Sequence, residues 1–469
     1  MITFAFWDKG IIILFFSVLA LIGFFASRQK TREKADYLLN GRKTGLFLFV
    51  ATNVSTWYGG ILGVGEFTYS YGVLNWFTQG FPYYIFALLF AFLFAEKIRK
   101  ASLFTIPDKI ESVYGRKAAL TASVLVFILV QPAPYLLMVG ELISMIFGIN
   151  LFFSLIIGLA VLIPFLMKGG FKADLYTDMF QFFVMFAGFA ILLFFSAGMF
   201  GGFTPLKASL PKEHLTLTGG APLTYILVWF VIALWTFVDP GFHQRCYAAK
   251  NGSIAKKGIL ISVGLWFLFD FLTTSTGLYA RAFLPALDRP VLAYPMLAES
   301  VLKEGFKGIF YAGMLATILS TLNSFLFLSG TTFSVDFASR IKKDNVKTKK
   351  FTYIGIIISG LIAVGLSLLL PSVVKLWYVI GSICIPGMIL PVVSAYYPKW
   401  RAPKEYINAE MITAVLASTF WFFAKEAFFK ESALYQIEPM LIGLILALTV
   451  HMTGAILKKQ NRLSENSIT

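Results

Sequence analysis

Thirteen long apolar runs, separated by short charged or Gly/Pro-rich connections, restrict what this chain can fold into. A helix needs about 20 mainly apolar residues to cross the hydrocarbon core of a bilayer. Only 14% of the residues are charged and 58% are hydrophobic, which leaves too few charges to cover a water-soluble globule of this size. The pattern predicts an all-α polytopic membrane protein with about 13 transmembrane helices. The runs lie at 9–27, 46–71, 76–96, 118–148, 151–167, 174–199, 223–244, 258–283, 307–335, 351–370, 373–397, 406–424 and 437–457.

The positive charge follows the order of these runs. Lys and Arg outnumber Asp and Glu by 40 to 24, and 30 of the 40 fall on one side if the N-terminus is outside. Cytosolic loops carry such an excess in membrane proteins, so the cluster at 340–350 is interpreted as a topology signal with a contribution from anionic lipid. We expect a single membrane transport domain over 1–469, in the plasma or inner membrane, with the N-terminus outside and the C-terminus cytoplasmic. Nucleic-acid binding is not indicated.

Two of the runs place polar residues at the same depth. The first, "VATNVSTWYGGILGVG" at 50–65, reaches the middle of a core about 30 Å thick near Ser55 if each residue rises about 1.5 Å. The second, "YAGMLATILSTLNSFLFLSGTTF", puts Thr317, Ser320, Thr321 and Ser324 on one helix face at that depth. Taken singly, such residues are explained by close helix packing or by bonds to the preceding turn. Together with a glycine-interrupted helix they favour a site for a hard cation, sodium or a proton.

A second interrupted run suggests an internal repeat. In "IALWTFVDPGFHQR", Asp239, Pro240 and Gly241 break the run at 223–244, because proline removes a backbone donor and clashes with the preceding turn. The two broken runs are five spans apart and oppositely oriented. This predicts inverted five-helix repeats at 46–199 and 223–397, an extra N-terminal helix at 9–27 and two C-terminal helices at 406–457. The long run at 118–148 is expected to bend at Pro132 and Pro134.

From about Asp36 to Tyr397 the sequence resembles the sodium/solute symporter family, which includes sodium-coupled glucose, proline, sialic acid and choline carriers. The resemblance is carried by "DYLLNGRKTG", "ATNVSTW", "GGFKADLYTDMFQ", "DPGFHQRCYAAK", "ATILSTLNS" and "FSVDF". It implies a LeuT-like fold and a secondary active transporter that is not an enzyme. The implied activity is sodium-coupled symport of a small polar organic solute into the cell by alternating access.

The resemblance also implies ion ligands. The first sodium is expected at the backbone carbonyls of Ala51, Val54 and Thr317 and the hydroxyls of Ser320 and Thr321. Some members bind a second sodium through the aspartate of the "TDMFQ" element, here Asp178, with Ser320 and two following hydroxyls. Asn323 and Ser324 hold those two positions, and Asn323 departs from the expected serine or threonine, which leaves one ion or two. A carboxylate facing solvent or lipid headgroups is the other interpretation of Asp178.

The solute is expected beside the two breaks. A choline-type aromatic cage would hold a quaternary ammonium by cation–π attraction, but Asp239 stands near the place of a cage tryptophan. It would either pair with a cationic solute or cap the broken helix, and the aromatic candidates are equally explained by packing. Asn53 replaces an aspartate of proline-type members. The candidates by depth are Asn53, Trp57, Gln79, Tyr135, Trp235 and Asp239.

Three more acids fall within the runs: Glu66, Glu141 and Asp270. Ionisable groups in hydrocarbon are functional candidates, so a proton-coupled carrier of the same fold, using Asp270 or Glu66, is the main alternative. An ion channel is a weaker one, because a pore lining would put polar faces on several spans. The sequence sets neither the solute's identity nor the oligomeric state.

Overall fold

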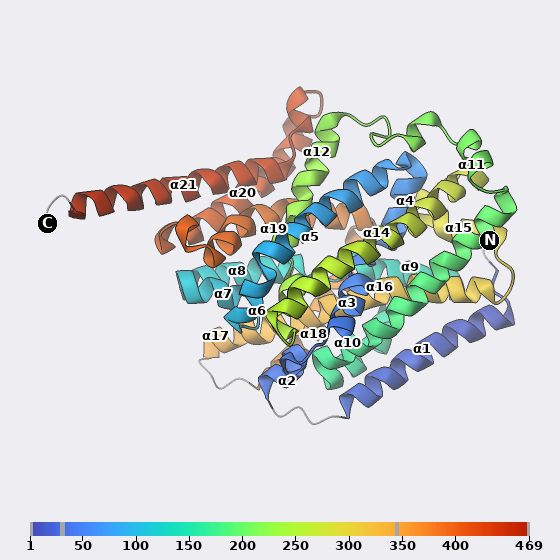
Figure 1. Cartoon of the computed structure of the whole chain (residues 1–469), viewed down its shortest axis with the longest axis horizontal. Coiled ribbons are helices and arrows are strands. Elements are labelled where there is room, and N and C mark those ends of the chain that lie inside the picture. Colours follow the sequence, from blue (N-terminus) through green and yellow to red (C-terminus); the bar gives the residue numbers. More distant parts are fainter. Residues whose placement is uncertain (1–2, 29–32, 343–346, 467–469) are drawn as a thin grey trace.

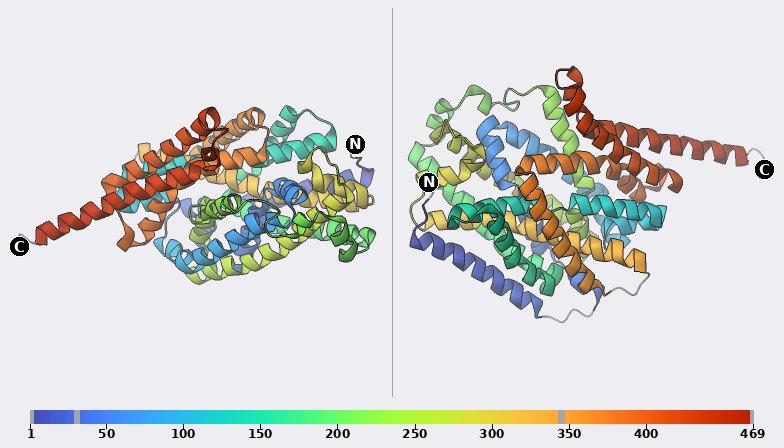
Figure 2. Two further views of the ribbon diagram at one scale, coloured as in Figure 1. Left: turned by 90° about the horizontal axis from the view of Figure 1, so that it is seen from above. Right: turned by 180° about the vertical axis from the view of Figure 1, so that it is seen from behind.

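The computed structural model describes residues 3–28, 33–342 and 347–466, and the regular secondary structure of this part is helical apart from an isolated β-bridge between Thr44 and Ala249. The long helices form one elongated bundle with α1 and α21 at opposite edges, and α21 extends beyond the other helices (Figures 1 and 2). The helices are α1 (Phe6–Ser27), α2 (Lys34–Leu39), α3 (Leu46–Ser55), α4 (Ile61–Tyr71), α5 (Phe81–Leu93), α6 (Ala95–Ala101), α7 (Ile106–Tyr114), α8 (Arg116–Leu129), α9 (Ala133–Phe147), α10 (Leu151–Phe200), α11 (Phe203–Ser209), α12 (Leu223–Ile232), α13 (Pro240–Ala248), α14 (Gly252–Phe283), α15 (Ala293–Val301), α16 (Phe306–Thr331), α17 (Ser339–Lys342), α18 (Thr348–Leu369), α19 (Val373–Tyr396), α20 (Lys404–Phe428) and α21 (Pro439–Asn466).

All thirteen predicted runs lie in helices. Within the described residues, 11 helices are long and apolar enough to cross a membrane, and the bent pair α3–α4 makes 12. The run at 151–167 corresponds to a shorter apolar helix, Leu151–Pro164, which continues into the rest of α10 through a kink at Gly170. Gly170 has a φ of 60°, and a Cβ there would lie 2.5 Å from the carbonyl oxygen of Tyr37, so the kink requires glycine.

Both predicted interruptions are confirmed. After α3 the chain forms a 3₁₀ turn at Thr56–Tyr58, passes through Gly59 and Gly60, and enters α4 at an angle of 56°. A Cβ on Gly59 would lie 2.3 Å from Thr321 Oγ1, so the small residue lets the break rest directly on α16.

The second break also consists of a 3₁₀ turn between two helices, but a capping aspartate and a proline form it in place of two glycines. A 3₁₀ turn at Ala233–Phe237 ends α12, and Asp239 caps α13 by accepting a hydrogen bond from the backbone N–H of Phe242 at 2.8 Å. Pro240 is the first residue of α13, where its missing N–H costs nothing. The bend predicted in 118–148 is also present, because α8 ends at Leu129 and α9 begins at Ala133.

Helix α16 lies inside the bundle rather than against lipid. In an apolar 18-residue window of the span Phe306–Ile341, which α16 begins, 94% of the residues are buried, compared with 22% in the corresponding window of Phe6–Ser27. It packs against α10, and the two backbones touch at Gly188 and Gly313, where a Cβ on Gly188 would lie 3.1 Å from the Gly313 Cα. This approach sets the polar face of α10 around Asp178 against the polar face of α16.

One residue of the basic cluster at 340–350, Arg340, departs from the expectation of a charge facing anionic lipid. Arg340 is only 6% exposed and forms ion pairs with Asp108, Glu111 and Asp336 at 2.7–2.8 Å. These ion pairs join α7 to the segment after α16, and the Arg340 guanidinium therefore does not face lipid headgroups. Residues 343–346 of the cluster lie outside the described part of the chain.

Candidate ion site and solute cavity

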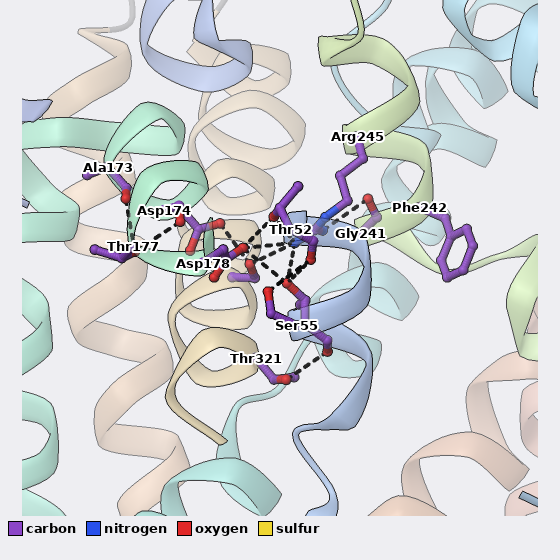
Figure 3. Close-up of polar contacts among 12 residues, drawn as sticks. Thr52, Ser55, Ala173, Asp174, Thr177, Asp178, Gly241, Phe242, Arg245 and Thr321 are labelled. Carbon is purple, nitrogen blue, oxygen red and sulfur yellow. Dashed lines mark hydrogen bonds and ion pairs between the residues drawn. The ribbon is translucent and has the colours of Figure 1, made fainter. Parts of the chain in front are cut away.

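The first broken span meets α16 at the predicted sodium position. Thr321 Oγ1 donates a hydrogen bond of 2.7 Å to the carbonyl oxygen of Thr56, in the 3₁₀ turn of the break (Figure 3). The five residues predicted to bind sodium lie on the two elements that this contact joins, and all are buried: Ala51, Val54, Thr317, Ser320 and Thr321.

The chemistry of this junction suits a hard cation. Ser320 Oγ is fully buried and has no hydrogen-bond partner among the described residues. The Thr317 hydroxyl donates to the Gly313 carbonyl at 2.7 Å within α16. Helix α3 ends here, and the Thr56 N–H is shared between the carbonyls of Thr52 and Val54. Helix ends leave carbonyl oxygens with incomplete partners, and such oxygens together with hydroxyls are the ligands that hard cations take.

Asp178 lies inside the protein, beside this junction. Its side chain is fully buried, so the interpretation of a carboxylate facing solvent or headgroups is wrong. Asp178 Oδ2 accepts hydrogen bonds from the hydroxyls of Thr52 and, at 3.2 Å, Thr56, and lies 3.5 Å from Nη2 of Arg245 (Figure 3). Distance from the end of the span had left that alternative open, and the packing of α3 and α16 against α10 excludes it by covering the carboxylate.

Two residues of this cluster were missed by sequence reasoning. Asp174, one turn before Asp178 on α10, is fully buried and accepts a hydrogen bond of 2.7 Å from Ser324 Oγ. Arg245, on α13, is 3% exposed, although the charge pattern counts it with the loop residues that set orientation. The signals were available: Asp174 and Asp178 share a helix face at i and i+4, and Arg245 directly follows the second break. Asn323 is also fully buried, and neither its side-chain oxygen nor its nitrogen has a partner in the described residues.

A cavity of about 190 Å³ lies between the two breaks. It is lined by Trp57, Gln79, Tyr135, Trp235 and Asp239, five of the six predicted solute residues. Asn53 is not among the lining residues. It is 4% exposed on α3, one turn before the break, whereas the first broken span contributes to the lining from Thr56 onward.

The cavity combines aromatic rings with carboxylates. Asp239 and Asp270 line it, and every charged lining residue in the described part of the chain is acidic. Asp239 Oδ2 accepts a hydrogen bond of 3.0 Å from Trp235 Nε1, so the residue both caps α13 and fixes a cavity wall. The aromatic lining residues are Trp57, Tyr58, Tyr83, Tyr135, Trp229, Trp235, Phe325, Trp377 and Tyr378.

The other three acids separate by environment. Asp270 is 8% exposed, lines the cavity and accepts a hydrogen bond from the Tyr84 hydroxyl, a partner that the sequence could not name. Glu141 lies 3.7 Å from Arg289, and both side chains are well exposed, which places this pair at the surface. Glu66 is partly buried and does not line the cavity.

Comparison with known proteins places this arrangement in context. The family model described as "Sodium:solute symporter family" matches residues 37–387. The chain is 22% identical over 439 residues to solute carrier family 5 member 4B of Mus musculus, covering 80% of this chain and 66% of that protein. It is 25% identical over 391 residues to the sodium/proline symporter of Staphylococcus aureus strain JH9, covering 77% of this chain and 75% of that one.

Solved structures show the same fold. The substrate-bound, outward-open state of a Na⁺-coupled sialic acid symporter superposes with a TM-score of 0.82 at 16% identity, covering 97% of both chains. Mhp1, a nucleobase-cation-symport-1 family transporter in a closed conformation, gives a TM-score of 0.59 at 14% identity, covering 92% of this chain and 96% of that one. The fold is therefore LeuT-like, with an inverted five-helix repeat and two broken helices.

Proposed function

The chain belongs to the sodium:solute symporter family, and from this we propose that it carries a small polar organic solute into the cell together with sodium, by alternating access. The bundle of apolar spans makes it a multi-pass membrane protein. The distribution of Lys and Arg supports an external N-terminus and a cytoplasmic C-terminus. The two breaks support repeats over 46–199 and 223–397, with 9–27 and 406–457 outside them.

The sodium site proposed here consists of the carbonyls of Ala51, Val54 and Thr317 and the hydroxyls of Ser320 and Thr321. One observation carries this proposal: Ser320 Oγ is fully buried and without a partner in the described residues, beside the contact that joins α16 to the break. A buried polar atom without a partner is costly. A sodium ion at this position would satisfy it.

In this mechanism sodium ties two elements together. An ion held by both α3 and α16 favours the conformation in which they touch, and opening toward the cytosol separates them and releases it. An inside-negative potential contributes about 2.3 kcal/mol per charge per 100 mV to inward movement. Solute and sodium are coupled because both bind best to the same conformation.

We propose the cavity between the breaks as the solute site, and a small organic cation as its occupant. The supporting observation is that Asp239 and Asp270 line it among aromatic rings, with no basic lining residue in the described part of the chain. Carboxylates attract a cation, and aromatic faces add cation–π attraction of about 0.5–2 kcal/mol. Hydrogen bonds from Phe242 and Trp235 use one site on each oxygen of Asp239, and a carboxylate has about four.

The sodium site is tested by thermal stability of the purified protein in sodium chloride and in potassium chloride. Sodium binding should raise stability by about 2.7 kcal/mol when its concentration is 100 times the Kd. The double variant Ser320→Ala with Thr321→Ala should lose that rise. The matched control is Ser329→Ala with Thr331→Ala, which removes two buried hydroxyls of the same helix outside the site. No sodium-specific rise in the wild type at any concentration would reject the proposal.

The solute site is tested by adding choline, or 3,3-dimethylbutanol as its uncharged analogue of the same shape, in sodium. We expect the cation to stabilise the protein and the neutral analogue to leave it unchanged. Asp239→Asn should weaken any response to the cation. Equal responses to the two compounds would exclude recognition of charge.

A proton-coupled carrier is the second candidate, because Asp270 is a buried carboxylate in the cavity wall. Uptake measured at fixed pH with and without sodium separates the two functions. Uptake that is unaffected by replacing sodium with potassium, but is abolished by Asp270→Asn, would establish the proton mechanism.

A further inference from the structure

A groove of about 420 Å³ lies where α8, α18 and the continuation of α16 meet. That continuation is a π-helical segment at Thr332–Ala338, a rare backbone form that is often found at functional sites. Within the described residues the lining of the groove is entirely apolar, and it includes Phe127 of α8, Phe333 and Phe337 of the π-helical segment, and Phe351 and Ile358 of α18.

Close packing of α18 against the π-helical segment forms the base of the groove. A Cβ on Gly355 would lie 2.5 Å from Phe333 Cβ, so α18 can approach the segment only with a glycine at this position. The Ser334 hydroxyl donates a hydrogen bond of 3.0 Å to the Thr348 carbonyl in the first turn of α18. The rings of Phe127 and Phe337 meet edge to face at 6.1 Å, and α8 therefore forms the second wall.

The groove opens on an apolar outer surface of the bundle. Ile341, one of its lining residues, is 66% exposed, and the neighbouring Val124 of α8 and Ile357 of α18 are also exposed. Exposed apolar side chains on a chain that spans a membrane face hydrocarbon rather than water. An occupant of this groove is therefore apolar and enters from the bilayer.

The depth of the groove matches one leaflet. Ile341 and Phe351 lie at the ends of the helices, whereas Phe127 and Ile358 follow the starts of α8 and α18 by about ten residues. Ten residues of helix rise about 15 Å, which is half of a hydrocarbon core about 30 Å thick. The groove therefore has the length of one phospholipid acyl chain.

Two basic residues lie above the groove on the same helices. Arg116 begins α8 and Lys347 directly precedes α18, and both side chains are exposed. About three helical turns separate Arg116 from Phe127 and Lys347 from Ile358, so each basic residue shares a helix face with a lining residue. Arg116 Nη2 donates to the Arg340 carbonyl, and a guanidinium has further N–H donors for a phosphate.

Nearby acids do not cancel this positive charge. Among the described residues, the carboxylates beside this end of the π-helical segment belong to Asp108, Glu111 and Asp336, and all three pair with Arg340 at 2.7–2.8 Å. Further basic side chains are exposed next to Arg116 and Lys347, namely Lys117, Lys349 and Lys350. Such a cluster at the membrane surface attracts anionic headgroups.

We propose that this groove binds one acyl chain of an anionic phospholipid, whose phosphate lies between Arg116 and Lys347. The lipid comes from the leaflet that faces the basic end of the bundle, and it joins α8 to α18. Its chain packs on Thr332–Ala338, the continuation of the helix that carries Ser320. The proposal is independent of the sodium and solute sites, because neither contributes a residue to the groove.

Native mass spectrometry of the delipidated, full-length protein tests this with dioleoylphosphatidylglycerol and dioleoylphosphatidylcholine. We expect one phosphatidylglycerol per chain, bound about 30-fold more tightly than phosphatidylcholine, because each of the two basic residues contributes about fivefold. Equal affinity for the two lipids would overturn the proposal. Glycerol 3-phosphate, which has no acyl chain, should not bind, and binding as tight as that of phosphatidylglycerol would show a phosphate site that does not use the groove.

Variants at the basic residues test the headgroup contact. Arg116→Gln with Lys347→Gln should lower the affinity for phosphatidylglycerol to that for phosphatidylcholine. The control is Lys250→Gln with Lys257→Gln, which removes two exposed lysines beside the start of α14 and should keep the wild-type preference. If the control loses as much affinity as the groove variant, the lipid is attracted by overall charge and the proposal fails.

A variant in the groove tests the position of the acyl chain without changing any charge. Ile341→Trp alters an exposed lining residue, so the fold should tolerate it, and the larger ring should prevent the tight binding of phosphatidylglycerol. Ile357→Trp, at an exposed position of α18 outside the lining, should bind the lipid as the wild type does. Wild-type affinity in Ile341→Trp would show that the chain lies elsewhere and would overturn the proposal.

Discussion

Replacing Gly59 by alanine perturbs the contact between the first break and α16 without straining the backbone. Gly59 has φ −52° and ψ −22°, in the right-handed helical region that alanine favours. Its added Cβ would lie 2.3 Å from Thr321 Oγ1, 2.4 Å from Thr321 Cβ and 2.7 Å from Thr321 Cγ2. Any effect of the substitution must therefore come from the side chain of Thr321 and its helix.

The size of the effect follows from these distances. Carbon atoms in contact lie about 3.5–4.0 Å apart, so the break and α16 must separate by about 1 Å, at a cost of about 1–3 kcal/mol for overpacking. The 2.7 Å hydrogen bond from Thr321 to Thr56 would then be lost. Losing the Thr321 hydroxyl as a partner of a charged group costs about 1.5–3 kcal/mol, which corresponds to a roughly 10- to 100-fold weaker sodium affinity.

The assay is a sodium titration of thermal stability at constant ionic strength, with potassium as the replacement ion. Gly264→Ala is the control, because its Cβ would meet no atom within 4 Å. We expect it to keep the wild-type sodium affinity. If Gly59→Ala folds and its sodium affinity stays within about twofold of wild type, the close contact between the break and Thr321 is not part of the ion site.

Other substitutions test the surrounding structure. Arg340→Gln removes the ion-pair partner of the buried Asp336 carboxylate and should lower the free energy of unfolding by about 3–5 kcal/mol. Arg289→Gln, at an exposed pair, should change it by less than about 1 kcal/mol, and denaturation of the two variants compares them. Gly170→Ala should cost about 1–3 kcal/mol, because φ is 60° there; a wild-type melting temperature would contradict this. Tyr84→Phe removes the donor to Asp270 and should destabilise by about 1–3 kcal/mol with sodium affinity unchanged, as measured by the same titration.

The predicted spans and breaks illustrate what a membrane sequence reveals on its own. Every apolar run is helical, three of them as two consecutive helices, because backbone groups in hydrocarbon have no other partners than those of the same segment. The breaks at Gly59 and at Asp239–Pro240 could also be predicted from the sequence, because glycine and proline change the backbone at their own position. Even the separate break in 118–148 followed from its prolines.

Residues whose role depends on a partner from another helix were harder to interpret. Arg340 was counted with a cluster expected to contact anionic lipid, and it is paired instead with three carboxylates. Asp178 stood near the end of a run and is fully covered, and Asn53 shares the predicted depth yet does not line the cavity. Depth along a span is a local property, but the direction in which a side chain faces a neighbouring helix is not.

The sequence by itself determined the class of protein, its spans, its two broken helices and the polar faces that meet between them. The tertiary structure alone decided that Asp174, Asp178 and Arg245 form one buried cluster, because they come from two helices far apart in the chain. The backbone conformation at a break depends on the residues at that position, and the helical periodicity shows which side chains share a face. The balance of charge in a buried site depends on which faces pack together, and this is settled only when α3, α10, α13 and α16 meet.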